Sequence, residues 1–353
     1  MGDGIRCMVM RGGTSKGLYF LAEDLPGDVD VRDDLLLRIM GSPDDRQIDG
    51  MGGAHPLTSK VAIVSASDVD GVDVDYLFLQ VVVDEPVVTD RQTCGNLLAG
   101  IGPFAFERGL VTRPAADTAS LRIRMLNTGG VAIATFPLRD GQPRYDGSMA
   151  ISGVPGTAAA IRLDFDDVAG SSCGALLPTG NIVDDVCGVE VTMIDNGMPV
   201  VVMRATDLGV SGHESCAELE ANTSLREKLE RVRLAAGPLM NLGDVRATTV
   251  PKLTLVAPPA DGGALATRSF IPHRCHDAIG VLGAVSVATA ALLGGPAADV
   301  AELDGGGTVV VEHPTGTFDV AVELVARDEG PVVERAGIIR TARKLMDGEV
   351  FPR

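Results

Sequence analysis

The sequence predicts an α+β protein made of two strand-rich units, each curled around one buried helix. Most of its apolar runs are short, rich in β-branched residues and bounded by Gly, Pro, Asp or Asn, which is typical of strands. Two segments, from Cys94 to about Phe106 and from Ala278 to Leu293, are apolar all round and indicate helices enclosed by protein. A chain of 353 residues is long enough for two domains with a core each.

Further helices and strands are expected in both halves of the chain. Asp33–Met40 and Ser224–Ala236 carry apolar residues on one helical face and are expected to cover a sheet. The stretch Ile338–Met346 is also expected to be helical. The first unit would extend to about residue 185, and the second would cover 186–326. The runs expected to form strands are Leu18–Leu21, Lys60–Ser65, Tyr76–Val83, Leu121–Asn127, Val131–Phe136, Val189–Ile194, Val200–Ala205, Leu253–Val256, Val309–His313 and Phe318–Val325.

The chain is strongly acidic, with a formal net charge of −18. This charge argues against nucleic acid or an anionic membrane surface as a partner. It is compatible with a small anionic substrate, because local cations and helix N-termini can outweigh a distant negative field. Such a substrate requires a locally positive pocket. Exposed strand edges would also allow a homodimer.

Three features concern where the protein resides. The run Ala278–Leu293 is rich in small residues and shorter than the roughly 20 residues of a membrane-spanning helix, so a helix buried in a soluble domain explains it better. Met1–Val9 has no apolar signal-peptide core, and no signal peptide is expected. The cysteines show no CxxC pair, so free thiols in a cytoplasmic protein are expected. They are Cys7, Cys94, Cys173, Cys187, Cys216 and Cys275.

Lys60 is the candidate base, since it ends the motif LTSK and opens an apolar strand. A lysine in such surroundings loses part of its preference for charge. Its pKa is therefore expected to fall toward neutrality, so that it can accept a proton. The alternative is a surface lysine whose charged end reaches water. The hydroxyl of Ser59, directly before it, is a candidate substrate contact.

Cys94 precedes Gly95 and Asn96 at the expected start of the first buried helix. Backbone N–H groups and the helix dipole favour a thiolate or a bound carboxylate there, and the Asn96 amide can contact a carboxylate too. The alternative for Cys94 is a small buried apolar side chain. One group that accepts a proton and one that holds negative charge suit carbon-acid chemistry, so the sequence predicts an isomerase.

The glycine-rich segment at 11–17 (RGGTSKG) lacks the order of a nucleotide-binding loop. It is either a polar hairpin turn or a carboxylate-binding nest of backbone N–H groups with Thr14, Ser15 and Arg11.

Turn signatures at 177–181 and 195–199 could also present polar groups to a cleft, with Thr179 and Asn181 as candidates. Near the second buried helix, Arg274 and His276 are candidate anion contacts. A metal site there is disfavoured, because no second cluster of ligands has a matching spacing.

Several motifs together resemble those of a known family. They are RGGTSKG at 11–17, SPDDRQIDGMGG at 42–53, LTSK at 57–60, TCGN at 93–96, LPTGN at 177–181 and RTARKLMDGEV at 340–350. As a set, they are similar to those of the 2-methylaconitate isomerase family, which has the diaminopimelate epimerase-like fold. The resemblance covers essentially the whole chain. It implies two similar halves, each a curved mixed or antiparallel sheet wrapping a central helix, with the active site in the cleft between them. It also implies that residues 327–353 return to the first half.

The family's catalytic lysine maps onto Lys60 through LTSK, and its cysteine maps onto Cys94 through CGN. Epimerases of this fold commonly carry a cysteine at the start of each central helix, whereas the second helix here begins with GVLG at 280–283. A racemase with two thiols is therefore disfavoured, and proton transfer by one lysine is favoured.

The resemblance thus implies an isomerase that moves a proton within an unsaturated tricarboxylic keto acid. Neutral Lys60 would take the proton, and Cys94 would either protonate the opposite position or line the pocket. No metal or organic cofactor is expected, because the substrate itself delocalises the charge. The alternatives are isomerisation of 2-methylaconitate and a non-catalytic carboxylate-binding protein.

Overall fold

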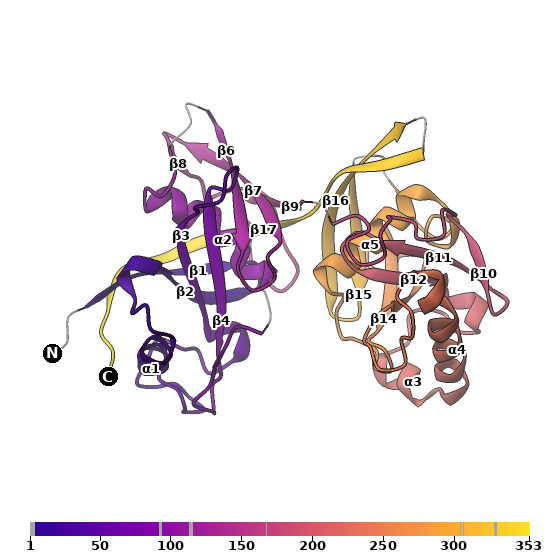
Figure 1. Ribbon diagram of the computed structural model, residues 1–353, viewed down its shortest axis with the longest axis horizontal. Coiled ribbons are helices and arrows are strands. Elements are labelled where there is room, and N and C mark those ends of the chain that lie inside the picture. Colours follow the sequence, from indigo (N-terminus) through magenta and orange to yellow (C-terminus); the bar gives the residue numbers. More distant parts are fainter. Residues whose placement is uncertain are drawn as a thin grey trace. The chain divides into compact units, whose positions relative to one another are not determined.

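The protein forms two compact units, one of Met1–Asp164 with Ile339–Arg353 and one of Phe165–Ile338 (Figure 1). The computed structural model describes residues 4–91, 94–112, 116–166, 168–303, 305, 307–327 and 330–353.

The unit boundaries differ from those expected at residues 185 and 327. The second boundary, between Ile338 and Ile339, lies inside the long strand β17 (Gly330–Val350). Its first part pairs with β16 (Gly316–Arg327), whereas its last part pairs with β1 (Ile5–Gly12). The chain therefore passes from the second unit into the first within a strand.

Unit 1 has a sheet that closes on itself around one helix. Strands β17, β1, β2, β3, β4, β6, β7 and β9 pair in this order, and β9 also pairs with β17. Helix α2 contacts β1, β2, β3, β4, β6 and β7, so it lies inside this ring. The remaining elements are β2 (Ser15–Leu21), α1 (Val29–Met40), β3 (Lys60–Ala66), β4 (Val74–Val81), β5 (Val88–Thr89), α2 (Gly95–Glu107), β6 (Thr118–Met125), β7 (Val131–Arg139), β8 (Gln142–Pro143) and β9 (Ala160–Phe165).

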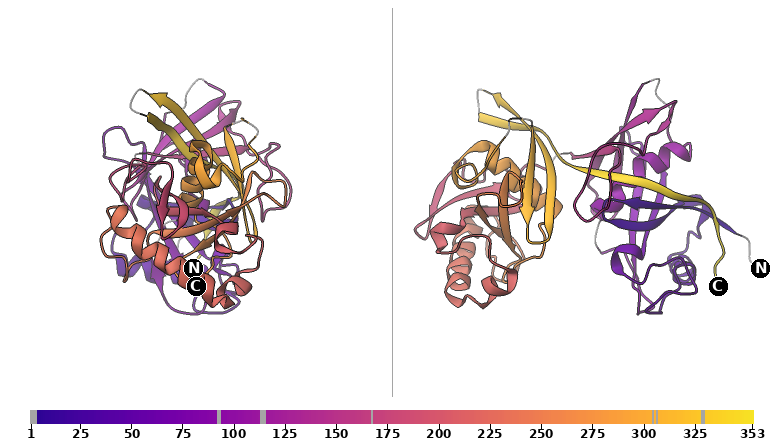
Figure 2. Two further views of the ribbon diagram at one scale, coloured as in Figure 1. Left: turned by 90° about the vertical axis from the view of Figure 1, so that its right-hand side faces the viewer. Right: turned by 180° about the vertical axis from the view of Figure 1, so that it is seen from behind.

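The ring joins the two ends of the chain. Figure 2 shows the C-terminal part of β17 running beside β1, and their antiparallel register extends from Ile5↔Val350 to Gly12↔Ala342. Unit 1 is therefore complete only when residues from both ends of the sequence are in place.

Unit 2 repeats the arrangement of unit 1. Strands β11 to β16 pair in sequence order with the same alternation of antiparallel and parallel ladders as β1, β2, β3, β4, β6 and β7, and helix α5 follows β14 as α2 follows β4 and β5. The α+β class and the two similar halves, each wrapping a central helix, are thereby confirmed. The elements are β10 (Asp184–Val186), β11 (Val189–Asp195), β12 (Pro199–Arg204), α3 (Cys216–Ala221), α4 (Thr223–Leu239), β13 (Lys252–Ala257), β14 (Leu265–Phe270), α5 (Val281–Leu293) and β15 (Thr308–His313).

The sheet of unit 1 has two different faces. Alternate residues such as Val9, Leu18 and Val61 pack on its outer face in one buried cluster with α1. The residues between them face α2 on the inner face. Tyr19, for example, reaches the Leu97 carbonyl of α2 with its hydroxyl, at 2.7 Å. The period of two along each strand therefore decides which side chains face the enclosed helix.

The prediction of a helix over Ile338–Met346 is wrong, because these residues lie in strand β17. Backbone pairing with β1 and β16, both distant in sequence, overrides the local helical pattern there.

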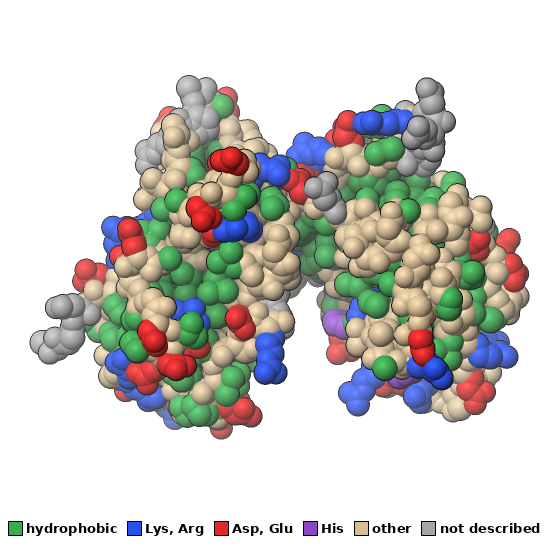
Figure 3. Space-filling model, in the orientation of Figure 1, with side chains coloured by type: hydrophobic (Ala, Val, Ile, Leu, Met, Phe, Trp, Pro, Cys, Tyr) green, Lys and Arg blue, Asp and Glu red, His purple; other side chains and the backbone are tan. Residues whose placement is uncertain are grey.

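No helix in the described ranges is long and apolar enough to cross a membrane. On the face shown in Figure 3, acidic and basic side chains are interspersed over both units. An anion must therefore be attracted by local groups.

Candidate active site

Lys60 begins β3 on the inner face of the unit 1 sheet. Its neighbours across the ladders are Gly17 on β2 and Gln80 on β4. The next residue, Val61, belongs to the outer cluster, so the alternation along β3 turns Lys60 toward α2. Only 7% of Lys60 is exposed, and it is therefore not a surface lysine that reaches water.

The Nζ atom of Lys60 is held by neutral partners. Its Nζ donates a hydrogen bond to Gln80 Oε1 at 2.9 Å and lies 4.9 Å from the centre of the Phe78 ring. Within the described part of the chain, no carboxylate forms an ion pair with it. The contacts of this nitrogen are therefore with an amide oxygen and an aromatic ring rather than with a carboxylate.

The Gln80 side chain has a defined orientation. Its Nε2 donates to the Ser59 carbonyl at 2.8 Å and to the Pro56 carbonyl at 3.1 Å. A flipped amide would point its oxygen at these two carbonyl oxygens, so Oε1 must face Lys60. Gln80 is therefore a positioning residue for the lysine amine.

Cys94 is the N-cap residue of α2 and is 8% exposed. Gly95 and Asn96 follow it in the first turn of the helix. The Cys94 carbonyl accepts from the Tyr76 hydroxyl at 3.4 Å. Because Tyr76 and Gln80 lie four residues apart on β4, the first turn of α2 and Lys60 share the inner face. The residues before Cys94 in the QTCGN motif, Gln92 and Thr93, lie outside the described residues.

Tyr19 and Tyr76 anchor the first turn of α2 to the sheet. Their hydroxyls donate to the carbonyls of Leu97 and Cys94, as described above. Burial, together with the nearby Cys94, raises the pKa of each phenol well above its usual value. Both tyrosines therefore remain neutral donors.

The turn between β1 and β2 lies against the start of α2. Asn96 Nδ2 donates to Thr14 Oγ1 at 3.0 Å. Ser15 is 1% exposed, and its hydroxyl has no hydrogen-bond partner among the described residues. An unpaired buried hydroxyl on a turn that contacts a helix start can bind an anionic oxygen.

Glycine permits this close approach. A Cβ atom on Gly12 would overlap the Asn96 carbonyl oxygen, and one on Gly13, where φ is +51°, would overlap the Asn96 side chain. The glycine-rich motif therefore allows the turn to lie directly on the helix start.

The Ser59 hydroxyl already forms hydrogen bonds with other groups of unit 1. It donates to the Val81 carbonyl at 2.8 Å and accepts from Gln47 Nε2 at 2.7 Å. Gln47 also bonds Ser42 Oγ and the Ala54 N–H, so it organises the loop that leads to Lys60. This arrangement favours a supporting role for Ser59 over direct contact with substrate.

The remaining candidates lie in unit 2. The Thr179 hydroxyl and the Asn181 amide both donate to Asp184, at 2.7 and 2.8 Å, so each side chain already has an acidic partner. Arg274 is exposed, and His276 Nδ1 accepts from the Ala278 N–H at 2.9 Å. Their assignment to the substrate site stays a prediction.

Sequence reasoning missed Gln80, Tyr19 and Tyr76. The sequence pattern that could have identified them is the alternation of side chains along a strand. It places these three polar side chains on the inner face of otherwise apolar strands. Among the described residues, no group of three or more His, Cys, Asp or Glu side chains could hold a metal ion.

Comparisons with known proteins agree with this organisation. The model of the PrpF protein family matches residues 3–352. The chain is 60% identical over 352 residues to a (4E)-oxalomesaconate Delta-isomerase of Novosphingobium sp. (strain KA1), covering 99% of this chain and 98% of that protein. It is 58% identical over 349 residues to a 4-oxalomesaconate tautomerase of Pseudomonas putida (strain KT2440), covering 98% and 95%.

A solved structure of a methylitaconate-delta-isomerase is similar along the whole chain. Its TM-score is 0.85 at 34% sequence identity, covering 99% of this chain and 96% of that one. These relatives are isomerases, so the prediction of an isomerase is confirmed. The chain belongs to the PrpF protein family.

Proposed function

We propose that the protein moves a proton within 4-oxalomesaconate, an unsaturated tricarboxylic keto acid, with Lys60 as the base. The observation that carries this proposal is the buried Lys60 amine, which is held by the Gln80 amide on the face of the sheet that meets the start of α2. The substrate named for the relatives from Novosphingobium and Pseudomonas supports the choice of acid. The runs LLRIMGSPDDRQIDG, VDYLFLQVVVD and EHPTG also resemble 4-oxalomesaconate tautomerases.

In the proposed reaction, the lone pair of neutral Lys60 takes a proton from a carbon next to the conjugated carbonyl groups. The electrons of the broken C–H bond move into the conjugated system and give a dienolate. Cys94 then gives its proton to the other end of that system, which leaves Lys60 as an ammonium and Cys94 as a thiolate. Proton exchange through solvent restores the neutral amine and the thiol before the next turnover. The Gln80 oxygen accepts a hydrogen bond from the lysine in both states. General base catalysis of this kind contributes about 10²–10⁴-fold.

The dienolate and the substrate carboxylates need fixed hydrogen-bond donors. The Gly95 and Asn96 N–H groups at the start of α2 are candidates for these donors, together with the hydroxyls of Thr14 and Ser15 on the turn that contacts Asn96. Donors fixed before the reaction stabilise developing charge without further reorganisation, and this is usually the larger catalytic contribution.

The exchange of substrate hydrogen with solvent tests the proposal. In D₂O, we expect the protein to convert 4-oxalomesaconate and to incorporate deuterium at its acidic carbon, as followed by NMR. Faster turnover of 2-methylaconitate in the same assay would favour the alternative isomerase. Binding without exchange would indicate a non-catalytic carboxylate-binding protein and contradict the proposal.

Cys94 is proposed as the acid that returns the proton. We expect Cys94→Ser to lower net turnover by about 10²-fold or more, because a serine hydroxyl is a much weaker acid. Lys60 would still remove the first proton, so deuterium should still enter the substrate. Turnover within about threefold of the parent would leave Cys94 as a pocket wall only.

Two further proposals concern cellular role. All six cysteines are free, which supports a reducing compartment such as the cytoplasm. With 4-oxalomesaconate as substrate, the enzyme would serve the degradation of aromatic acids such as gallate or protocatechuate.

A further inference from the structure

Three cations stand in a row on the outer face of unit 1. In the antiparallel ladders, Arg11 of β1 lies directly opposite Arg343 of β17 on one side and Lys16 of β2 on the other. Like charges directly opposite each other on neighbouring strands are destabilising. None of the three has a carboxylate partner within the ranges that the structure describes.

The other end of the same ladder shows the ordinary arrangement. There, Arg6 of β1 lies opposite Glu349 of β17, and its Nε is 3.8 Å from Asp24. The pairing of Arg11 with Arg343 is therefore a local departure from the charge complementarity of these two strands.

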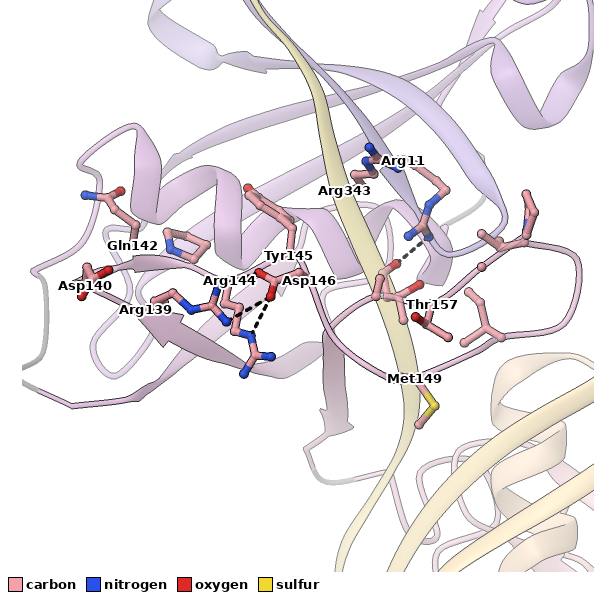
Figure 4. A pocket seen from close by; sticks show the side chains of 17 residues that line it. Arg11, Arg139, Asp140, Gln142, Arg144, Tyr145, Asp146, Met149, Thr157 and Arg343 are labelled. Atoms are coloured by element: carbon pink, nitrogen blue, oxygen red, sulfur yellow. Dashed lines mark hydrogen bonds and ion pairs between the residues drawn. The ribbon is translucent and has the colours of Figure 1, made fainter.

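A cavity of about 680 Å³ adjoins this pair (Figure 4). Arg11 and Arg343 lie on one side of it, and Arg139 and Arg144 lie on the other. Asp146 accepts two hydrogen bonds from Arg139, at 3.0 and 3.2 Å, and lies 3.5 Å from Arg144. Four arginines line the cavity against two aspartates, so its walls carry excess positive charge in an acidic protein.

The cavity is distinct from the candidate active site. Gly12 faces α2, because a Cβ there would meet Asn96 and Leu97, and the alternation along β1 turns Arg11 to the opposite face. Lys60 lies on the inner face, as described above.

Arg11 nevertheless connects the cavity to the active-site turn. Its Nη1 donates to the Gly13 carbonyl at 2.8 Å and to the Thr341 carbonyl at 3.0 Å. Burial and the charge of Arg343 lower the pKa of Arg11. An anion beside both side chains would offset the repulsion between the two guanidinium groups. Any ligand of Arg11 would thus act on the turn that carries Thr14 and Ser15.

We propose that this cavity is a second anion site, which takes a small polyanion bearing carboxylate or phosphate groups between Arg11 and Arg343. The planar guanidinium groups offer paired N–H donors that match either group. The site is separate from the proposed reaction and does not depend on it.

Isothermal titration calorimetry with inorganic phosphate, and separately with citrate, tests the proposal on the full chain. We expect Arg343→Gln to weaken binding at one site by about tenfold or more, because it removes a charge-assisted contact. The matched control is Arg6→Gln on the same pair of strands, which should bind like the parent. Lys60→Met removes the amine of the candidate active site and so distinguishes any binding there from binding in the cavity.

The outcomes are distinguishable. Loss of binding in Arg343→Gln and its retention in Lys60→Met support the second site, and the stronger of the two ligands identifies the preferred anionic group. Equal binding by Arg343→Gln and the parent, or no binding by the parent, overturns it. Thermal unfolding checks the fold, and Arg343→Gln should not lower the melting temperature, since it relieves repulsion with Arg11.

Discussion

Replacement of Lys60 by methionine is expected to lower turnover and solvent exchange by at least about 10²–10⁴-fold. Methionine is unbranched and apolar and fits the buried position, but it has no lone pair that can accept the substrate proton. The substitution leaves Gln80 Oε1 without its partner, so we expect a loss of about 1–3 kcal/mol in the free energy of unfolding. Steady-state assays, NMR exchange and chemical denaturation measure these effects.

Lys60→Arg provides a second test with a long nitrogen-bearing side chain. Arginine keeps N–H donors at this position but does not lose its proton at neutral pH, so it cannot act as a base. We expect this variant to be inactive as well. Activity near the parent level in either variant would show that another group removes the proton.

Gly12→Ala is expected to disturb the start of α2 more than its small size suggests. The added Cβ would overlap the Asn96 carbonyl oxygen and lie 3.0 Å from Leu97 Cα, and both atoms belong to the helix backbone. Backbone cannot rotate away as a side chain can, so the first turn of α2 must move. Overpacking of this kind costs about 1–3 kcal/mol. Chemical denaturation measures that cost, and kcat reports the displaced donors.

Gly27→Ala is the control for this substitution, since a Cβ at Gly27 would meet no atom within 4 Å. It should leave stability and kcat nearly unchanged. Equal stability of Gly12→Ala and Gly27→Ala would mean that the helix start is less closely packed than described.

The two central helices could be predicted because an enclosed helix is apolar on every side, a pattern that neither a strand nor a surface helix requires. The C-terminal strand could not. Residues 338–346 look helical in isolation, and their strand conformation depends on partners in β1 and β16. The boundary expected at residue 327 lies after Ile338 for the same reason, because the passage between the units falls inside that strand.

The candidate site was predictable where one short motif carries the signal. Lys60 at a strand start and Cys94 at a helix start follow from their immediate neighbours. Gln80 was missed because its role depends on a ladder register with Lys60, twenty residues earlier. The hydrogen bonds of Thr179 and Asn181 to Asp184 were not predicted either, because they depend on how the turn folds back on Asp184.

The closed ring of unit 1 has a consequence for biosynthesis. Unit 2 is continuous in sequence and has all its residues before translation ends. Most of unit 1 precedes unit 2 in the sequence, yet the gap between β9 and β1 is filled by β17, which is synthesised after unit 2. Until β17 is synthesised, β1 and β9 therefore each present an unpaired strand edge, which exposes this part of the nascent chain to pairing with other chains.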